Sequence, residues 1–339
     1  MEQAGRNERR IMRFYFAPME GITGYIYRRE AWKLFPDADK VYAPFIQPNA
    51  KRVLGPKERR DLLSENNTGI PLVPQVLTNH ADGFIRAGRA LEELGYREIN
   101  LNLGCPSGTV VSKGKGAGML ENREQLLTFL ETVFREEWTA DITIKTRLGM
   151  SAEEGEEAFG ELLAIFRQFP IRELIIHPRY REDFYRGEPR QKIFRQALAE
   201  TMDICYNGNV FSIKNYEELI KQYPEGSFGA VMIGRGLLAN PALIRELQGG
   251  KHLKKEELKQ LHDQVLHAYR SIDFGERNTL FKLKELWNYW GTVFEEPDRY
   301  LKKIRKANTY TEYLPAVNRL FEETELTEHH GFLPYTGRI

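Results

Sequence analysis

Two residues of this chain stand out as able to do chemistry, a cysteine and a lysine. Cys105 opens the segment CPSGTVVSKGKGAGML, a long Gly- and Lys-rich stretch that directly follows an apolar run. A thiol with an ordinary pKa of about 8.5 is mostly protonated at neutral pH, so an accessible Cys105 can donate a proton as well as act as a nucleophile. Lys145 lies inside the apolar run ITIKT, where a buried ammonium is costly unless an anion faces it. We therefore interpret Lys145 as a functional residue.

The second cysteine is of a different kind. Cys205 lies inside the apolar run DICYN, and we assign it to the core. No second Cys or His lies at ligand spacing from Cys105, so we expect no bound metal. Two cysteines cannot form a disulfide framework, which favours a reducing, cytoplasmic location.

Polar residues also follow the other apolar runs, at the positions where strands would end. Gln75 and Asn102 could be amides satisfied at the rim of a sheet, and a lone His177 is more often structural than catalytic. Gly208, and Gly234 with Arg235 before the segment LLANPALIREL, leave bare backbone N–H groups near a predicted helix start. This arrangement suits an anion such as a phosphate, although a plain glycine turn gives the same pattern. The full set of candidates is Pro18, Met19, Glu20, Gln75, Asn102, Cys105, Lys145, His177, Arg179, Asn207, Gly208, Asn209, Gly234 and Arg235.

Eight short apolar runs could position these residues. They cover residues 13–19, 40–46, 71–77, 98–103, 141–148, 173–177, 202–207 and 230–234. Several are continuously apolar, as expected for parallel strands buried on both faces. Helix-length segments lie between them, and those at 82–94, 152–169 and 212–223 are amphipathic. The alternation predicts an α/β fold, a (β/α)8 TIM barrel whose chemistry sits at the carboxyl ends of the strands. A doubly wound sheet is the alternative.

The pattern of apolar and polar residues changes after about residue 246. Strand-like runs stop, and residues 256–272, 279–290, 298–306 and 310–323 have helical patterns. We predict a catalytic barrel over residues 1–245, a smaller C-terminal helical domain over 246–325 and a loose tail over 326–339.

Composition excludes several classes of protein. The 339 residues are 41% hydrophobic and 29% charged, which excludes wholesale disorder and fibrous repeats. With 49 Lys and Arg against 48 Asp and Glu, the formal charge is +1, which excludes a uniformly basic nucleic-acid binder but not a local basic patch. No apolar stretch approaches the roughly 18 residues of a membrane span, and the polar start MEQAGRNERR shows no signal peptide.

Seven motifs occur in order, one at each of seven runs: APMEGIT, PQVL, INLNLGCPS followed by KGKGAGML, IKTRLG, IIHPR, YNGN and VMIGRG. In this combination the sequence resembles the tRNA-dihydrouridine synthase family of flavoenzymes. The motifs cover roughly residues 12–245, and the helical C-terminal part is compatible with the family.

The resemblance implies a set of roles. FMN would lie across the barrel mouth, with its phosphate on Asn207, Gly208, Asn209, Gly234 and Arg235. Its ring would contact Pro18, Met19, Glu20, Gln75, Lys145 and His177. NADPH would reduce the FMN, and a uridine flipped out of tRNA would receive hydride at C6 and a proton from Cys105 at C5. Asn102 and Arg179 are candidates for holding the uracil, with His177 close by.

A tRNA-binding protein needs basic side chains for phosphates and aromatic rings for stacking. One cluster comprises Arg299, Lys302, Lys303, Arg305 and Lys306, together with Trp287, Tyr289 and Trp290. Two further clusters follow the second and sixth runs, at residues 51–60 and 179–190. Each run could equally be a solvated helix face. No membrane association is expected, and no obligate protein partner is evident.

Three other functions remain open on sequence grounds. A related FMN enzyme could act on free pyrimidines, and it would not need the helical domain. A barrel aldolase could use Lys145 as a Schiff base, which leaves Cys105 unexplained. A non-catalytic RNA chaperone could retain the fold alone.

Overall fold

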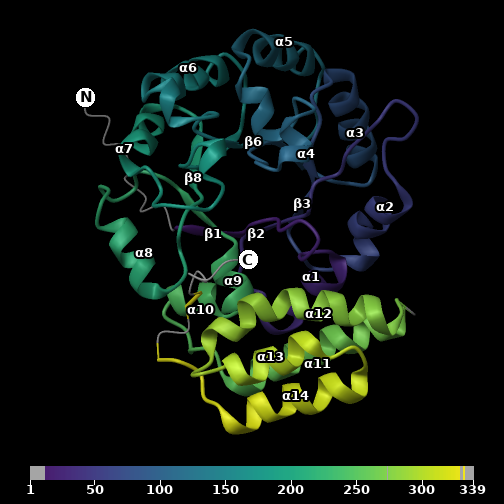
Figure 1. The fold of residues 1–339 in the computed structure, drawn as a ribbon. Helices are drawn as coiled ribbons and strands as arrows, with labels where there is room; N and C mark the ends of the chain where they lie inside the picture. Colours follow the sequence, from purple (N-terminus) through teal and green to yellow (C-terminus); the bar gives the residue numbers. More distant parts are fainter. Residues whose placement is uncertain (1–11, 273, 329–330, 333–339) are drawn as a thin grey trace, which may run out of the picture.

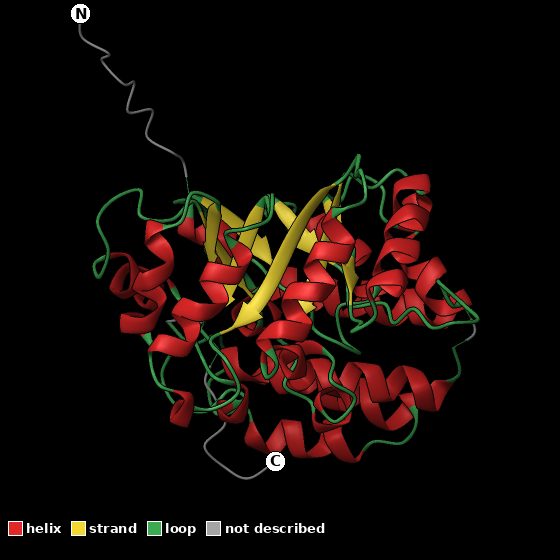
Figure 2. Cartoon of the chain, turned by 90° about the horizontal axis from the view of Figure 1, so that it is seen from above, coloured by secondary structure: helices red, strands yellow, loops and turns green. Residues whose placement is uncertain are grey.

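A computed structural model describes residues 12–272, 274–328 and 331–332. In this part of the chain, nine short parallel strands form one sheet that curls into a barrel (Figures 1 and 2). Their order is β3-β2-β1-β9-β8-β7-β6-β5-β4. The bounds are β1 Arg13–Phe16, β2 Lys40–Tyr42, β3 Leu72–Val73, β4 Gln75–Val76, β5 Glu98–Leu103, β6 Asp141–Arg147, β7 Glu173–His177, β8 Asp203–Tyr206 and β9 Ala230–Ile233.

The barrel closes through the third predicted run, which the structure divides into β3 and β4. Pro74 separates the two pieces and has no N–H to donate to a strand ladder. β3 pairs with β2, whereas β4 pairs with β5, so this one run links both ends of the sheet. The predicted (β/α)8 barrel is therefore confirmed, with one strand interrupted at a proline.

Helices surround the barrel (Figure 1). They are α1 Tyr25–Leu34, α2 Pro56–Leu62, α3 Ala81–Glu93, α4 Gly108–Val111, α5 Arg123–Phe134, α6 Glu157–Phe166, α7 Gln191–Phe194, α8 Ile213–Ile220, α9 Arg235–Ala239 and α10 Leu243–Leu247. The predicted helix at 152–169 is broken, because a 3-10 turn at Ala152–Glu154 ends at Gly155 with a φ of +79°. The segment LLANPALIREL is likewise two helices, since Asn240 is extended before Pro241 and separates α9 from α10.

Four helices follow the barrel and pack beside it: α11 Lys255–Ser271, α12 Glu276–Trp290, α13 Asp298–Lys306 and α14 Tyr310–Glu323. α11 contacts α1, and α12 contacts α9. Trp287 and Trp290 are completely buried, and the indole N–H of Trp287 donates to the Tyr313 hydroxyl at 2.7 Å. The expectation that these two tryptophans stack on RNA is therefore wrong, because both rings belong to the helical core.

The start of the predicted tail is held in place. Leu326 forms an antiparallel bridge with Phe294, and the Thr327 N–H donates to the Val293 carbonyl at 2.8 Å. Residues 329–330 and 333–339 lie outside the described residues. None of the helices in the described ranges is long and apolar enough to cross a membrane.

Candidate active site

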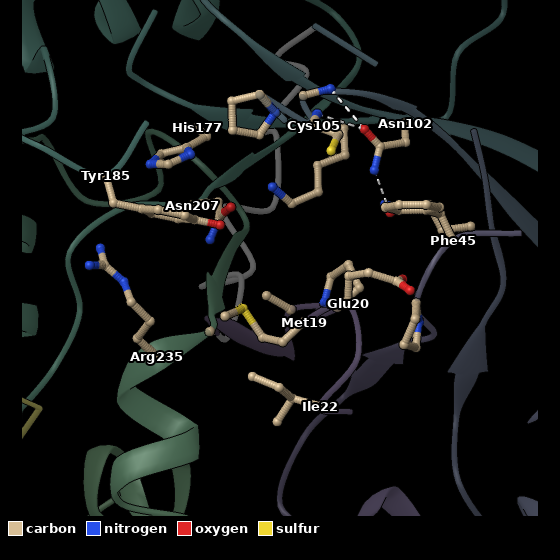
Figure 3. Close-up of a pocket in the computed structure, with 18 of the residues that line it drawn as sticks. Met19, Glu20, Ile22, Phe45, Asn102, Cys105, His177, Tyr185, Asn207 and Arg235 are labelled. Carbon is tan, nitrogen blue, oxygen red and sulfur yellow. Dashed lines mark hydrogen bonds between the residues drawn. The ribbon is translucent and has the colours of Figure 1, made fainter. Parts of the chain in front are cut away.

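A cavity of about 300 Å³ opens at the carboxyl ends of the strands. Twelve of the fourteen candidate residues line it, and Figure 3 shows several of them facing one another across it. These are Pro18, Met19, Glu20, Gln75, Asn102, Cys105, Lys145, His177, Asn207, Gly208, Gly234 and Arg235. Asn209 and Arg179 are not among the lining residues.

Cys105 lies in a tight turn after β5. The Asn102 Oδ1 accepts hydrogen bonds from the N–H groups of Gly104 and Cys105, at 3.0 and 2.9 Å. Gly116 packs on the turn with a φ of +57°, and a Cβ there would lie 2.9 Å from the Cys105 carbonyl oxygen, so glycine is required. Burial raises the pKa of the Cys105 thiol. The thiol is therefore protonated at neutral pH and able to donate a proton into the cavity.

Lys145 projects into the same cavity from β6. Burial, followed by the nearby Arg147, lowers the pKa of Lys145 to about 7. Among the described residues its ammonium has no hydrogen bond or ion pair. Arg147 differs, because it donates to the carbonyl oxygens of Gly104, Tyr180 and Phe184 at 2.8 to 2.9 Å. Lys145 is thus suited to bind an anionic or hydrogen-bond-accepting group within the cavity.

His177 has a tautomer fixed by its neighbour. Its Nε2 lies 2.8 Å from the Nη1 of Arg179, and a guanidinium can only donate, so Nε2 accepts and Nδ1 carries the proton. Burial, together with Arg147 and Lys145, holds the pKa of His177 well below its usual value. His177 is therefore a neutral ring at neutral pH.

Arg179 contacts His177 but does not line the cavity, and it is fully buried. Besides His177, it donates to the carbonyl oxygens of Arg186 and Gly187 and to the Asn209 Oδ1. This placement does not favour the expected contact between Arg179 and a uracil, because its donors are directed to the protein itself.

Arg235, the first residue of α9, also lines the cavity. Its Nη2 donates to the Asn209 Oδ1 at 3.2 Å, and its guanidinium lies 4.7 Å from the ring centroid of Tyr185 and 5.0 Å from that of Phe211. A Cβ at Gly208 would come within 2.2 Å of the Tyr206 hydroxyl, so a side chain at position 208 would force a rearrangement. Arg235 thus contributes a cation to the cavity lining, as Lys145 does when it is protonated.

Four aromatic residues that line the cavity were not among the fourteen candidates: Phe45, Tyr185, Phe211 and Tyr289. Of these, Tyr289 was expected in the RNA-binding cluster instead. Tyr185 is 48% exposed and lies in the loop after β7. Tyr289 comes from α12, so the helical part of the chain contributes to the cavity wall. An aromatic residue in a loop or a helix has no sequence pattern that would indicate this placement.

The charged groups of the lining favour a ligand that carries an anionic group. Glu20 is the lone carboxylate among the described lining residues, against Lys145, Arg147 and Arg235. In the described residues, no group of three or more His, Cys, Asp or Glu side chains could hold a metal ion.

Comparisons with known proteins give a consistent result. The model of a family described as Dihydrouridine synthase (Dus) matches residues 15–331. A Staphylococcus aureus (strain Mu50) protein named "Probable tRNA-dihydrouridine synthase" is 24% identical over 323 residues, which is 92% of this chain and 93% of that protein. The Pseudomonas aeruginosa protein named "tRNA-dihydrouridine synthase B" is 26% identical over 276 residues, covering 78% and 80% of the two chains.

Among solved structures, Old Yellow Enzyme from Pichia sp. AKU4542 aligns over 73% of this chain and 86% of that chain, with a TM-score of 0.50 and 11% identity. At this identity the likeness concerns the fold alone.

Proposed function

Since the chain belongs to the dihydrouridine synthase family, we propose that it is a flavin-dependent oxidoreductase that reduces the C5–C6 double bond of specific uridines in tRNA. The product is 5,6-dihydrouridine. The observation that carries this proposal is the protonated Cys105 thiol. It lies in one cavity with Arg235 and with Lys145, which has no hydrogen bond or ion pair among the described residues. The proposed substrate also implies a cytoplasmic location.

The cavity suits FMN as the cofactor. Arg235, oriented by Asn209, would bind the phosphate together with Asn207, Gly208 and Gly234. Pro18, Met19, Glu20, Gln75, Lys145 and His177 would surround the ring. When bound, the flavin supplies hydride to C6 of the uracil, and we propose NADPH as the source of the reducing equivalents. Lys145 supports this assignment, because its cation would stabilise negative charge on a reduced ring system.

The residues of the chain would divide the remaining tasks. Cys105 delivers a proton to C5, so that one hydride and one proton add across the double bond. Asn102 holds the Cys105 turn through its oxygen, and one N–H of its amide goes to Gln75, which leaves the second N–H for a uracil oxygen. Arg179 is a positioning residue, because it fixes the tautomer of His177 and orients Asn209.

The helix α13 offers a surface for the RNA. Its apolar residues Tyr300, Leu301 and Ile304 are buried against the helical core. Its basic residues are exposed on the other side: Arg299, Lys302, Lys303, Arg305 and Lys306. A one-sided basic face of this kind can bind phosphates even though the net charge of the chain is only +1.

The purified protein should be yellow, with flavin absorbance near about 450 nm and FMN released by acid. Incubated with NADPH and tRNA from cells that lack this gene, it should add the mass of two hydrogens to one mapped uridine. Cys105→Ala should lower the rate by about 100-fold or more while tRNA binding persists. Cys205→Ala, at the buried cysteine, is the matched control and should keep the activity.

Each alternative predicts a different result. Turnover of free uracil but not of tRNA would favour an enzyme of free pyrimidines, and borohydride trapping of a substrate on Lys145 would favour an aldolase. A colourless protein that binds tRNA but leaves every uridine unreduced would refute the proposed function.

A further inference from the structure

The Cys105 turn is the upper end of a chain of buried hydrogen bonds. The N–H groups of Gly104 and Cys105 donate to the Asn102 Oδ1. The Asn102 Nδ2 donates to the Gln75 Oε1 at 2.7 Å, and the Gln75 Nε2 donates to the Asn100 Oδ1 at 2.8 Å. These contacts join the carboxyl end of β5 to β4 and back to the interior of β5.

The chain continues downward, away from the cavity. The Asn100 Nδ2 donates to the Thr143 hydroxyl at 3.0 Å, and this hydroxyl donates to the Glu98 Oε1 at 3.1 Å. Glu98 also accepts from the Tyr42 hydroxyl at 3.0 Å, and its Oε2 pairs with the Lys40 Nζ at 2.7 Å. Asn100 and Thr143 are fully buried and do not line the cavity.

The two ends of this hydrogen-bond chain, the Cys105 turn and Glu98, impose the same donor-to-acceptor direction on it. A backbone N–H can only donate, and an ionised carboxylate can only accept, so every amide between them has one permitted orientation. Reversing any amide would bring two N–H groups face to face and two oxygens face to face. In a buried setting each such mismatch is costly, and the hydrogen-bond chain therefore keeps or loses its order as a unit.

We propose that Thr143 and Asn100 are positioning residues that hold the Cys105 turn in place, although neither touches the cavity. They act through Gln75 and Asn102, and Glu98 anchors the lower end. This coupling depends on the protein alone, so it operates whether or not flavin or tRNA is bound.

Thr143→Val tests the coupling, because valine keeps the shape of threonine but removes the hydroxyl. The Asn100 Nδ2 then loses its acceptor inside the barrel. The protein either keeps an unpaired buried N–H or rearranges the amides, and the second outcome frees the turn that holds Cys105. Thr143→Ser retains the hydroxyl and should therefore keep the hydrogen-bond chain intact.

The readout is the rate at which iodoacetamide alkylates Cys105 in the purified protein, mapped by mass spectrometry between about pH 7 and pH 9. The half-buried thiol should react about tenfold faster in Thr143→Val, the factor expected when one buried donor loses its partner. Thr143→Ser should remain within about twofold of the unsubstituted protein. Thr146→Val is the matched control on the same strand, since among the described residues the Thr146 hydroxyl bonds to the Arg147 carbonyl alone and takes no part in the hydrogen-bond chain.

A Thr143→Val protein that alkylates at the unsubstituted rate would overturn the proposal. So would equal acceleration in Thr143→Ser or in Thr146→Val. If Thr143→Val does not fold, Asn100→Leu serves instead, because leucine is close to asparagine in shape but neither accepts from Gln75 nor donates to Thr143. It should show the same acceleration, and its absence would count equally against the proposal. Alkylation requires neither flavin nor tRNA, so its outcome is separate from that of the proposed function.

Discussion

Replacing Lys145 by methionine should stabilise the flavin-free protein at neutral pH. In the folded chain the pKa of Lys145 falls to about 7 from its ordinary 10.5, because burial disfavours the charged form. The unfolded chain therefore binds a proton that the folded chain tends to lose. At pH values below the ordinary pKa of lysine, this difference lowers the free energy of unfolding. Methionine removes the loss while keeping a similar shape.

The magnitude follows from the two pKa values. At about 1.36 kcal/mol per pH unit, the difference corresponds to an upper bound of about 4 to 5 kcal/mol near pH 7. The ammonium is partly open to the cavity, so solvent relieves some of this penalty, and we expect about 2 kcal/mol. For a chain of this size that is a rise in Tm of roughly 3 °C.

The sign of the pH dependence is part of the prediction. The cost is fully present below about pH 7 and disappears as the pH approaches about 10.5, where lysine is neutral in both states. The advantage of Lys145→Met should therefore be largest at and below about pH 7 and reduced to a small fraction at about pH 10. Urea unfolding of the flavin-free proteins at several pH values measures it, with Lys113→Met as an exposed-lysine control.

A Lys145→Met protein that is no more stable than the unsubstituted protein at pH 7 would refute this reasoning. An advantage that persists unchanged to pH 10 would refute it as well, because it would then come from packing rather than from charge.

Arg235→Leu should weaken FMN binding by about 10- to 100-fold, the value of charge-assisted bonds to a phosphate, and leave riboflavin binding unchanged. Fluorescence titration measures both, and equal losses for the two flavins would contradict a phosphate contact. Lys302→Glu combined with Lys303→Glu should weaken tRNA binding and flatten its dependence on salt by about 1 to 2 in log–log slope, as filter binding would show; an unchanged slope would remove α13 from the interface. Because His177 stays neutral in the folded chain, it should cost stability as the pH falls below about 6.5, where the unfolded chain takes up a proton. The stability of His177→Gln, measured by urea unfolding, should accordingly decline less between about pH 6.5 and pH 4.5, and a parallel decline would contradict the assignment.

Short-range patterns predicted buried parallel strands covered by helices, and they favoured a barrel over the doubly wound alternative. Continuous apolar runs that alternate with amphipathic segments specify buried parallel strands and covering helices, and both signals lie within a few residues of sequence. Cys105 and Lys145 were identifiable for a similar reason, because each is chemically unusual for its immediate surroundings. Even the division of the third strand follows from a local cause, the missing N–H of Pro74.

The partners of the side chains were decided only by the tertiary structure. Nothing near Arg179 in the sequence shows that it lies behind His177 or that its donors are already used. Tyr289 reaches the cavity, and Trp287 and Trp290 become core, because of how α12 packs against the barrel. The hydrogen-bond chain from Cys105 to Glu98 depends on the register of β4, β5 and β6, which places Gln75 beside Asn100 and Asn102 beside Lys145. Strand and helix patterns arise from neighbouring residues, whereas register and packing arise from contacts between segments far apart in the chain.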